Sequence, residues 1–275
     1  METITLNNGV DMPVIGLGTF PMNKMPLVKN IRTAVQAGYT AFDTSFAYQN
    51  EKSVGWGVKL CGKKRESLFI TTKISNTQQY KSDAATALKD SLHKLKLSYV
   101  DLYLIHWPVP EKYLQTWKEM EKLYKDGLVR AIGVCNFHQH HIEKLLEIAD
   151  IIPAVNQVEL HPLLSQNELR TYCVKQGIQI EAYTPIARMD EKLVKNEVLL
   201  KIAANYKKTV VQIILRWDYQ NGIIPIPKSA NPERLKQNID IFDFCLTDRE
   251  MEAINALNQN YRVRYDPDNC DFRKL

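Results

Sequence analysis

Short apolar runs alternate with amphipathic stretches along the whole chain, and this alternation constrains the fold more than any other feature. Eight runs recur: VIGLG, YTAFDT, LFITTKI, VDLYLIHW, VRAIGVCN, AVNQVEL, IQIEAYTP and GIIPIPK. Strands rich in β-branched and aromatic residues, each followed by a helical pattern, predict βα units and a parallel sheet. Eight such units at regular spacing predict an α/β fold, a closed (β/α)8 TIM barrel.

A β-hairpin is expected ahead of the barrel, because Asn8-Gly9 lies between alternating apolar residues. We find no linker or low-complexity segment, so residues 1–275 are expected to form one domain, as α/β barrels of this length often do. An open doubly wound sheet is the alternative. Its G-x-G-x-x-G fingerprint does not follow the first strand, where IGLGTFP leads to proline rather than a helix.

Composition limits the kinds of molecule that this protein could bind and the compartment in which it could work. The net charge is a mild +5, and the only tight basic cluster, at 63–65, contains no aromatic residue. This favours a small-molecule ligand over nucleic acid. Five cysteines without C-x-x-C spacing predict free thiols in a reducing compartment. The N-terminus lacks the features of a signal peptide, and no apolar run approaches the ~18 residues of a membrane helix. We therefore expect a cytoplasmic monomer.

Titratable side chains stand at the ends of three consecutive predicted strands. Asp43 ends the second strand, with Tyr48 just beyond it, while Lys73 ends the third and His106 the fourth. In a (β/α)8 barrel the carboxyl ends of all strands face one rim, where active sites are built. The four side chains are therefore expected to converge.

The chemistry of this group follows from pKa values. A free tyrosine has a pKa near ~10, and a neighbouring buried ammonium lowers it. Lys73 can supply that charge, with Asp43 as the counter-ion that keeps it charged. Tyr48 would then be a tuned general acid. A buried, uncharged His106 would orient a substrate oxygen. This pattern suggests reduction of a carbonyl group and leaves the hydride donor to be found.

Simpler interpretations exist for each residue. Asp43 and Lys73 would form only a structural ion pair in many barrels, and His106 alone would most often be a strand-end histidine with satisfied hydrogen bonds. Lys73 could instead be a Schiff-base lysine. The presence of four titratable residues at one rim favours the catalytic interpretation over a structural ion pair, and a Schiff-base lysine stays the minor alternative.

The segment FHQHHI could suggest a metal site formed by His138, His140 and His141. No cysteine or carboxylate completes a spaced set of ligands nearby in the sequence, and the segment opens an amphipathic helix. We therefore expect the solvated start of a helix and no metal.

A second candidate site follows the last predicted strand. KSANPERLKQN places Lys228 and Ser229 ahead of a helix start, with Asn231 as N-cap and Pro232 at the first helical position. A helix N-terminus with lysine and Arg234 nearby is typical of an anion site, and barrels often bind phosphate at this point.

With these residues in view, the chain resembles the aldo-keto reductases from the hairpin to about residue 257. The matching stretches are GLGTF, FDTSFAYQNEKSVG, TTKI, DLYLIHWP, IGVCNF, VNQVELHP, AYTPI and IPKSANPERLKQN. The resemblance implies a (β/α)8 barrel that binds NADPH across the rim without a Rossmann fingerprint, and an NADPH-dependent carbonyl reductase. The positions that match the catalytic tetrad of this family are Asp43, Tyr48, Lys73 and His106.

The resemblance also implies a set of cofactor contacts. Asn136 and Gln157 match positions that hold the nicotinamide carboxamide, and Tyr183 matches the aromatic residue that stacks on the ring. The pyrophosphate stretch would be lined by Thr184, Ile186 and Arg188. The positions that grip the 2′-phosphate and adenine are Lys228, Ser229, Arg234 and Asn238. Two departures, Cys135 for a common serine and Gln237 for a usual glutamate, bear on cofactor affinity.

The substrate pocket is expected to be open, because the connections after Trp107 and after Arg188 are short. Its walls would be Phe20, Ser75, Trp107 and the tail after residue 258. In this the chain looks like the branch that includes diketogluconate reductases and prostaglandin F synthases of unicellular parasites. The competing class is a regulatory or sensing barrel that binds NADPH but turns over slowly, and the intact tetrad argues against it.

Overall fold

A parallel barrel forms the centre of the protein in the computed structural model, which describes residues 1–274. Its strands pair in chain order, without the reversal of a doubly wound sheet. All eight predicted runs contain a strand of the barrel: β3 (Leu17–Gly18), β4 (Ala41–Asp43), β5 (Phe69–Ile74), β6 (Val100–Ile105), β7 (Val129–Cys135), β8 (Val155–Glu159), β9 (Gln179–Tyr183) and β10 (Ile224–Pro225).

Backbone hydrogen bonds between the first and last strands close the barrel. The Gly16 N–H donates to the Pro225 carbonyl at 3.0 Å, and the Gly18 N–H donates to the Pro227 carbonyl at 3.2 Å. A Cβ at Gly18 would lie 3.0 Å from the Ile226 carbonyl oxygen, so glycine permits this close approach. Closure confirms the TIM barrel and excludes the open-sheet alternative.

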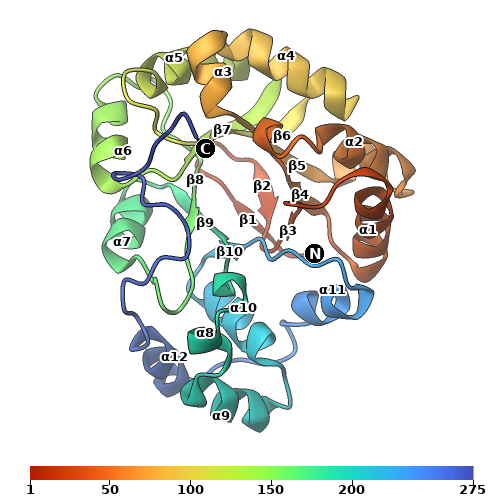
Figure 1. Ribbon diagram of the computed structural model, residues 1–275, viewed down its shortest axis with the longest axis vertical. Coiled ribbons are helices and arrows are strands. Elements are labelled where there is room, and N and C mark those ends of the chain that lie inside the picture. The colour runs from red at the N-terminus through yellow and green to blue at the C-terminus, as the bar shows by residue number, and fades with distance from the viewer. Residues whose placement is uncertain (275) are drawn as a thin grey trace.

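Helices surround the strands (Figure 1). Most bury one apolar face against the barrel, and several begin at a capping side chain, as Asp83, Thr209 and Thr247 do. The helices are α1 (Lys24–Ala37), α2 (Glu51–Leu60), α3 (Asn76–Lys81), α4 (Ala84–Leu95), α5 (Tyr113–Lys125), α6 (Gln139–Leu146), α7 (Asn167–Lys175), α8 (Glu191–Val194), α9 (Glu197–Tyr206), α10 (Val210–Gln220), α11 (Pro232–Ile239) and α12 (Asp248–Asn255), with 3₁₀ turns η1 (Phe46–Tyr48), η2 (Arg65–Ser67) and η3 (Ala187–Met189).

The predicted N-terminal hairpin is present and closes the bottom of the barrel. Strands β1 (Thr3–Thr5) and β2 (Asp11–Pro13) pair antiparallel around Gly9, whose φ is 82°. The hairpin side chains Leu6 and Met12 are buried in one apolar cluster with barrel residues such as Leu102. With the lower end sealed, the opposite rim is left for a ligand.

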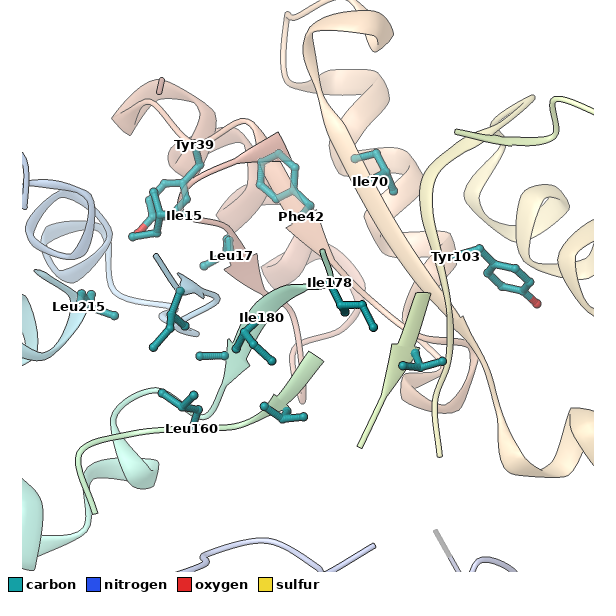
Figure 2. Packing of buried hydrophobic residues seen from close by; sticks show 14 of the residues in the cluster. Ile15, Leu17, Tyr39, Phe42, Ile70, Tyr103, Leu160, Ile178, Ile180 and Leu215 are labelled. Carbon is teal, nitrogen blue, oxygen red and sulfur yellow. The ribbon is translucent and has the colours of Figure 1, made fainter. Parts of the chain in front are cut away.

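Apolar side chains fill the space around the strands (Figure 2). Phe42 and Ile70 lie opposite each other on β4 and β5, and both are almost fully buried. Burial on this scale is the main favourable term in folding. It holds the strand ends, and therefore the rim, in a fixed arrangement.

The C-terminal tail crosses the rim after α12 and runs past α7 and α6 (Figure 1). The backbone N–H of Val263 donates to Glu159 Oε1 at 2.7 Å, and that of Arg264 donates to Glu159 Oε2 at 3.2 Å. The buried carboxylate at the end of β8 therefore anchors the tail over the barrel mouth.

Candidate active site

The four rim residues predicted from strand ends do converge. Asp43 is the last residue of β4, Lys73 lies near the end of β5, and His106 follows β6 directly. Tyr48 closes the 3₁₀ turn η1, which Ser45 starts by accepting a hydrogen bond from the Ala47 N–H. These three strands are hydrogen-bonded neighbours, so the side chains at their ends share one end of the barrel.

A buried ion pair between Lys73 and Asp43 forms the base of the group. Lys73 Nζ lies 2.7 Å and 2.6 Å from the two carboxylate oxygens of Asp43, and it also donates to the Thr44 carbonyl at 3.0 Å. Burial by itself would lower the pKa of Lys73, but Asp43 and Tyr48 outweigh it and raise that pKa above its usual value. Lys73 is therefore protonated at neutral pH. A Schiff-base lysine needs a neutral amine, so this environment argues against that alternative.

Tyr48 lies over this cation. The ammonium of Lys73 is 5.1 Å from the centre of the Tyr48 ring. Burial raises the pKa of Tyr48 to about 12, while the charge on Lys73 acts to lower it. The sequence led us to expect a net lowering. The effect of Lys73 has the expected sign, but in this structure the loss of hydration is larger.

His106 completes the group as a neutral imidazole. Burial, followed by the positive charges of Lys73 and Arg264, holds the pKa of His106 well below its usual value. Its Nδ1 lies 3.2 Å from Ser45 Oγ, and its ring meets that of Tyr48 edge-on with centroids 5.7 Å apart. An uncharged His106 is what the sequence analysis expected.

Gln157 joins the ion pair to a second buried acid. Its Nε2 donates to Asp43 Oδ2 at 2.9 Å and to Glu181 Oε2 at 2.6 Å, while its Oε1 lies 3.6 Å from the Cys135 thiol. Burial is the largest cause that raises the pKa of Glu181, to about 8, and Asp43 adds to it. Sequence reasoning missed Glu181, although a lone glutamate in the apolar run IQIEAY was a signal that it is buried in the barrel.

Asn136 and Tyr183 form a polar contact beside the tetrad. The Tyr183 hydroxyl donates to Asn136 Oδ1 at 2.7 Å, and Asn136 Nδ2 donates to the His106 carbonyl at 3.0 Å. Asn136 directly follows β7 and has a left-handed φ of 64°, a conformation that asparagine tolerates better than most residues. Cys135 presents its sulfur to the same amide at 3.3 Å.

The connection after β9 has an unusual backbone. Thr184 and Arg188 take left-handed φ values of 54° and 56°. Thr184 and Ile186 are half-buried, and Arg188 is exposed. This segment connects β9 to α8, and its assignment to the pyrophosphate stays a prediction.

The segment predicted to bind an anion follows β10 and leads into α11. Asn231 caps α11 by accepting from the N–H groups of Glu233 and Arg234 at 2.9 Å and 3.1 Å. Glu233 pairs with Lys236 at 3.2 Å. Within residues 1–274, Arg234 and Lys228 are both exposed and neither lies within ion-pair distance of a carboxylate. Two unpaired cations at a helix start suit a phosphate group.

The remaining cofactor positions lie on the same segment. Ser229 and Asn238 are both buried, and Ser229 Oγ accepts from the Asn231 N–H at 3.2 Å. Gln237 is exposed on α11. The set therefore combines exposed cations with buried uncharged groups, which fits a charged phosphate next to a flat, uncharged base.

The predicted pocket walls fall into two classes. Phe20 is 51% exposed and its ring packs against that of Tyr48 at a tilt of 47°, with centroids 5.0 Å apart, while Trp107 packs between His106 and Phe272 of the tail. Ser75 is buried instead as the N-cap of α3, where its hydroxyl accepts from the Gln78 N–H at 3.3 Å. Its assignment to the pocket gains no support from this position.

Two further observations concern the cysteines and the possibility of a membrane-spanning helix. All five cysteines are free, as the sequence predicted. No helix of residues 1–274 is both long enough and apolar enough to span a bilayer.

Curated relatives cover the chain almost end to end. The glyoxal reductase of Bacillus subtilis (strain 168) is 50% identical over 272 residues, which is 98% of each chain. The 9,11-endoperoxide prostaglandin H2 reductase of Trypanosoma cruzi is 44% identical over 97% of this chain and 95% of its own. The methylglyoxal reductase DkgA of Escherichia coli (strain K12) is 41% identical over 96% of each chain. The branch suggested by the sequence is thus confirmed.

Solved structures agree with the fold. An aldo-keto reductase from a Medee basin deep-sea metagenome library, MGS-M4, superposes with a TM-score of 0.93 at 42% identity, over 98% of this chain and 99% of its own. A Bombyx mori aldo-keto reductase solved in complex with NADP superposes with a TM-score of 0.88 at 37% identity, over 97% and 96%. The family model described as "Aldo/keto reductase family" matches residues 14–259, and the chain belongs to that family.

Proposed function

We propose that this protein reduces the carbonyl group of small aldehydes or ketones, with NADPH as the hydride source and Tyr48 as the general acid. Membership of the family makes it an NADP-dependent oxidoreductase. The observation that supports the finer assignment is the Lys73–Asp43 ion pair directly beneath the Tyr48 ring, with neutral His106 at its edge.

Tyr48 is suited to donate a proton. With its pKa raised to about 12 by burial, it is protonated at neutral pH and carries the proton that the product alcohol needs. When that proton leaves, the tyrosinate is stabilised by the Lys73 ammonium, because opposite charges attract strongly where water is excluded. Lys73 thus lowers the energy of the charged form without changing its own protonation.

His106 is suited to orient the substrate oxygen. Ser45 Oγ already accepts from the Ala47 N–H, so its own proton is free to donate to His106 Nδ1. A neutral imidazole that accepts at Nδ1 carries its proton on Nε2. That N–H can hold a carbonyl oxygen beside Tyr48 without competing for the proton to be transferred.

NADPH, when bound, supplies the hydride. The anion site supports its binding, since Lys228 and Arg234, which have no carboxylate partner within residues 1–274, stand beside the start of α11. Lys228, Ser229 and Arg234 would hold the 2′-phosphate, and Asn238 the adenine. At the other end Asn136 and Gln157 would hold the carboxamide, and the half-exposed ring of Tyr183 would stack on the nicotinamide.

Glu181 must stay neutral for the ion pair to work. Two carboxyl groups share one amide, that of Gln157, and one cation lies nearby. A second negative charge at Glu181 would compete with Asp43 for the Lys73 ammonium. It would also disfavour the tyrosinate form of Tyr48. A protonated Glu181 avoids this conflict, so we assign it a positioning role beneath the tetrad.

The substrates to test first are small dicarbonyl compounds. Relatives at 50% and 41% identity carry the names glyoxal reductase and methylglyoxal reductase. The mouth of the barrel has an exposed aromatic wall at Phe20 and a buried one at Trp107, which fits short, partly apolar aldehydes. A regulatory barrel with slow turnover would leave them unreacted.

Replacing Tyr48 with phenylalanine tests the general acid. Tyr48→Phe should keep NADPH affinity and lose roughly 10²–10⁴ in kcat with methylglyoxal, the usual worth of a positioned proton donor. Cofactor fluorescence titration and steady-state kinetics measure the two quantities. If the variant keeps more than roughly a tenth of the wild-type rate, Tyr48 is not the acid.

The phosphate site can be tested by cofactor preference. Wild type should prefer NADPH over NADH by roughly 10² in kcat/KM, because contacts to the 2′-phosphate are charge-assisted but exposed to water. Arg234→Ala should remove most of this gap by weakening NADPH alone. Lys236→Ala, on the same helix but paired with Glu233, is the matched control and should leave the gap intact. Wild-type values within roughly threefold of each other would refute the assignment.

The state of Glu181 predicts how stability depends on pH. Its pKa of about 8 in the fold exceeds the ~4.3 of an unfolded glutamate, so protonation favours the folded state. Ionisation of Glu181 therefore costs wild type stability as pH rises from about 4 through 8, and Glu181→Gln, which cannot ionise, lacks this contribution. Urea unfolding should show the variant gaining roughly 2–4 kcal/mol on wild type between pH 5 and pH 8.

Glu252→Gln, at an exposed position of α12, controls for the removal of a carboxyl group as such. A stability difference between Glu181→Gln and wild type that stays constant across this pH range would show that Glu181 is not held neutral.

A further inference from the structure

Three imidazoles at the start of α6 meet one carboxylate from the C-terminal tail. His138, His140 and His141 come from the FHQHHI segment, and Asp268 lies 130 residues beyond His138. One donor atom from each of the four lies within 4.8 Å of the others. The sequence offered no carboxylate to complete a ligand set, because the tail reaches α6 only through the fold.

We propose that His138, His140, His141 and Asp268 bind one divalent transition-metal ion, with zinc as the ion of best fit. Three imidazole nitrogens and one carboxylate oxygen form a donor set that zinc takes in four-coordinate sites. Magnesium and calcium prefer all-oxygen sites, so three histidines disfavour both.

The distances already approach those of a metal site. Asp268 Oδ2 lies 2.8 Å from His138 Nδ1, and Asp268 Oδ1 lies 3.1 Å from His140 Nε2 and 3.5 Å from His141 Nε2. Ligands on a tetrahedral ion with bonds of ~2.0–2.1 Å are separated by about 3.3 Å. Small rotations of the side chains would therefore bring the four donors to one ion.

Metal binding would break two existing hydrogen bonds of the histidines. His138 Nε2 accepts from Arg262 Nη2 at 2.9 Å, and His141 Nδ1 accepts from the His138 backbone N–H at 3.2 Å. With metal on the opposite nitrogens, both of these atoms would carry protons instead. Arg262 has other partners within reach, since Glu159 lies 4.0 Å and Asp266 3.9 Å from its guanidinium.

The site would fasten the tail across the barrel mouth. Asp268 precedes Phe272 by four residues, and the Phe272 ring packs against Trp107 with centroids 6.4 Å apart. The Phe272 carbonyl accepts from Asn76 Nδ2 at the start of α3. A metal at α6 would therefore hold the segment that reaches the pocket wall, at a place separate from the catalytic tetrad.

The test uses the full chain without an affinity tag, stripped with EDTA and titrated with zinc chloride by calorimetry. We expect one zinc per chain. Asp268→Asn and His140→Ala should each weaken binding at least about tenfold, since even groups that only support metal ligands are worth 10–100-fold. His140 is exposed, so its removal leaves the core unchanged. His93→Ala and Asp271→Asn, both exposed and outside the cluster, should bind as wild type does.

Cobalt chloride gives a second readout, because a four-coordinate nitrogen and oxygen site produces visible absorption that Asp268→Asn should lose. Circular dichroism establishes that each variant is folded. Zinc binding that is absent in wild type, or that is equally tight in Asp268→Asn and wild type, would overturn the proposal. Both readouts follow metal rather than turnover, so the outcome is independent of the carbonyl reductase assignment.

Discussion

The ion pair between Lys73 and Asp43 is the interaction on which the rest of the site depends. Both charges are removed from water, at a cost that only good geometry and further hydrogen bonds can offset. The ammonium of Lys73 donates hydrogen bonds to both oxygens of the Asp43 carboxylate and to the Thr44 carbonyl. The barrel provides this geometry because β4 and β5 are adjacent and their ends are fixed by buried neighbours. The result is a buried ammonium held at a fixed position beneath the Tyr48 ring.

A second layer of polar groups keeps that charge balanced. Gln157 donates to both Asp43 and Glu181, so one amide connects the ion pair to the second buried acid. Further out, the carboxylate of Glu159 holds the tail by two backbone N–H groups, and the tail brings Phe272 to Trp107. In the proposed site, charge balance inside the barrel depends on a protonated Glu181 on β9, while the Glu159 carboxylate on β8 holds the tail over the barrel mouth.

Much of the fold could be predicted from local patterns. Each apolar run became a strand, and Asn8-Gly9 became the hairpin turn, because β-branched alternation and turn chemistry act over a few residues. The tetrad followed from the barrel rule that strand ends meet at one rim. Contacts between distant segments could not be predicted in this way: Glu181 with Gln157, and Asp268 with the histidines of α6, are pairs that only the closed fold defines. The net pKa of Tyr48 could not be predicted from the sequence either, because it depends on how completely the fold excludes water from the hydroxyl. Ser75 differs from these residues, because its role is local. It caps α3 in a capping box with Gln78, a pattern that the sequence contains, whereas we expected it in the pocket wall.

The central claim is that the charge on Lys73 stabilises the ionised form of Tyr48. The most direct measurement is the pH dependence of alcohol oxidation with NADP⁺, where the tyrosinate accepts the proton and the logarithm of kcat/KM rises with pH below its pKa. For Lys73→Met the same rising line should be displaced to higher pH by at least ~1 unit, because an opposite charge at this range shifts a pKa by 1–3 units. Asp43, left without its partner, would push the pKa in the same direction. Superimposed profiles for wild type and Lys73→Met, at near-equal rates, would contradict the account.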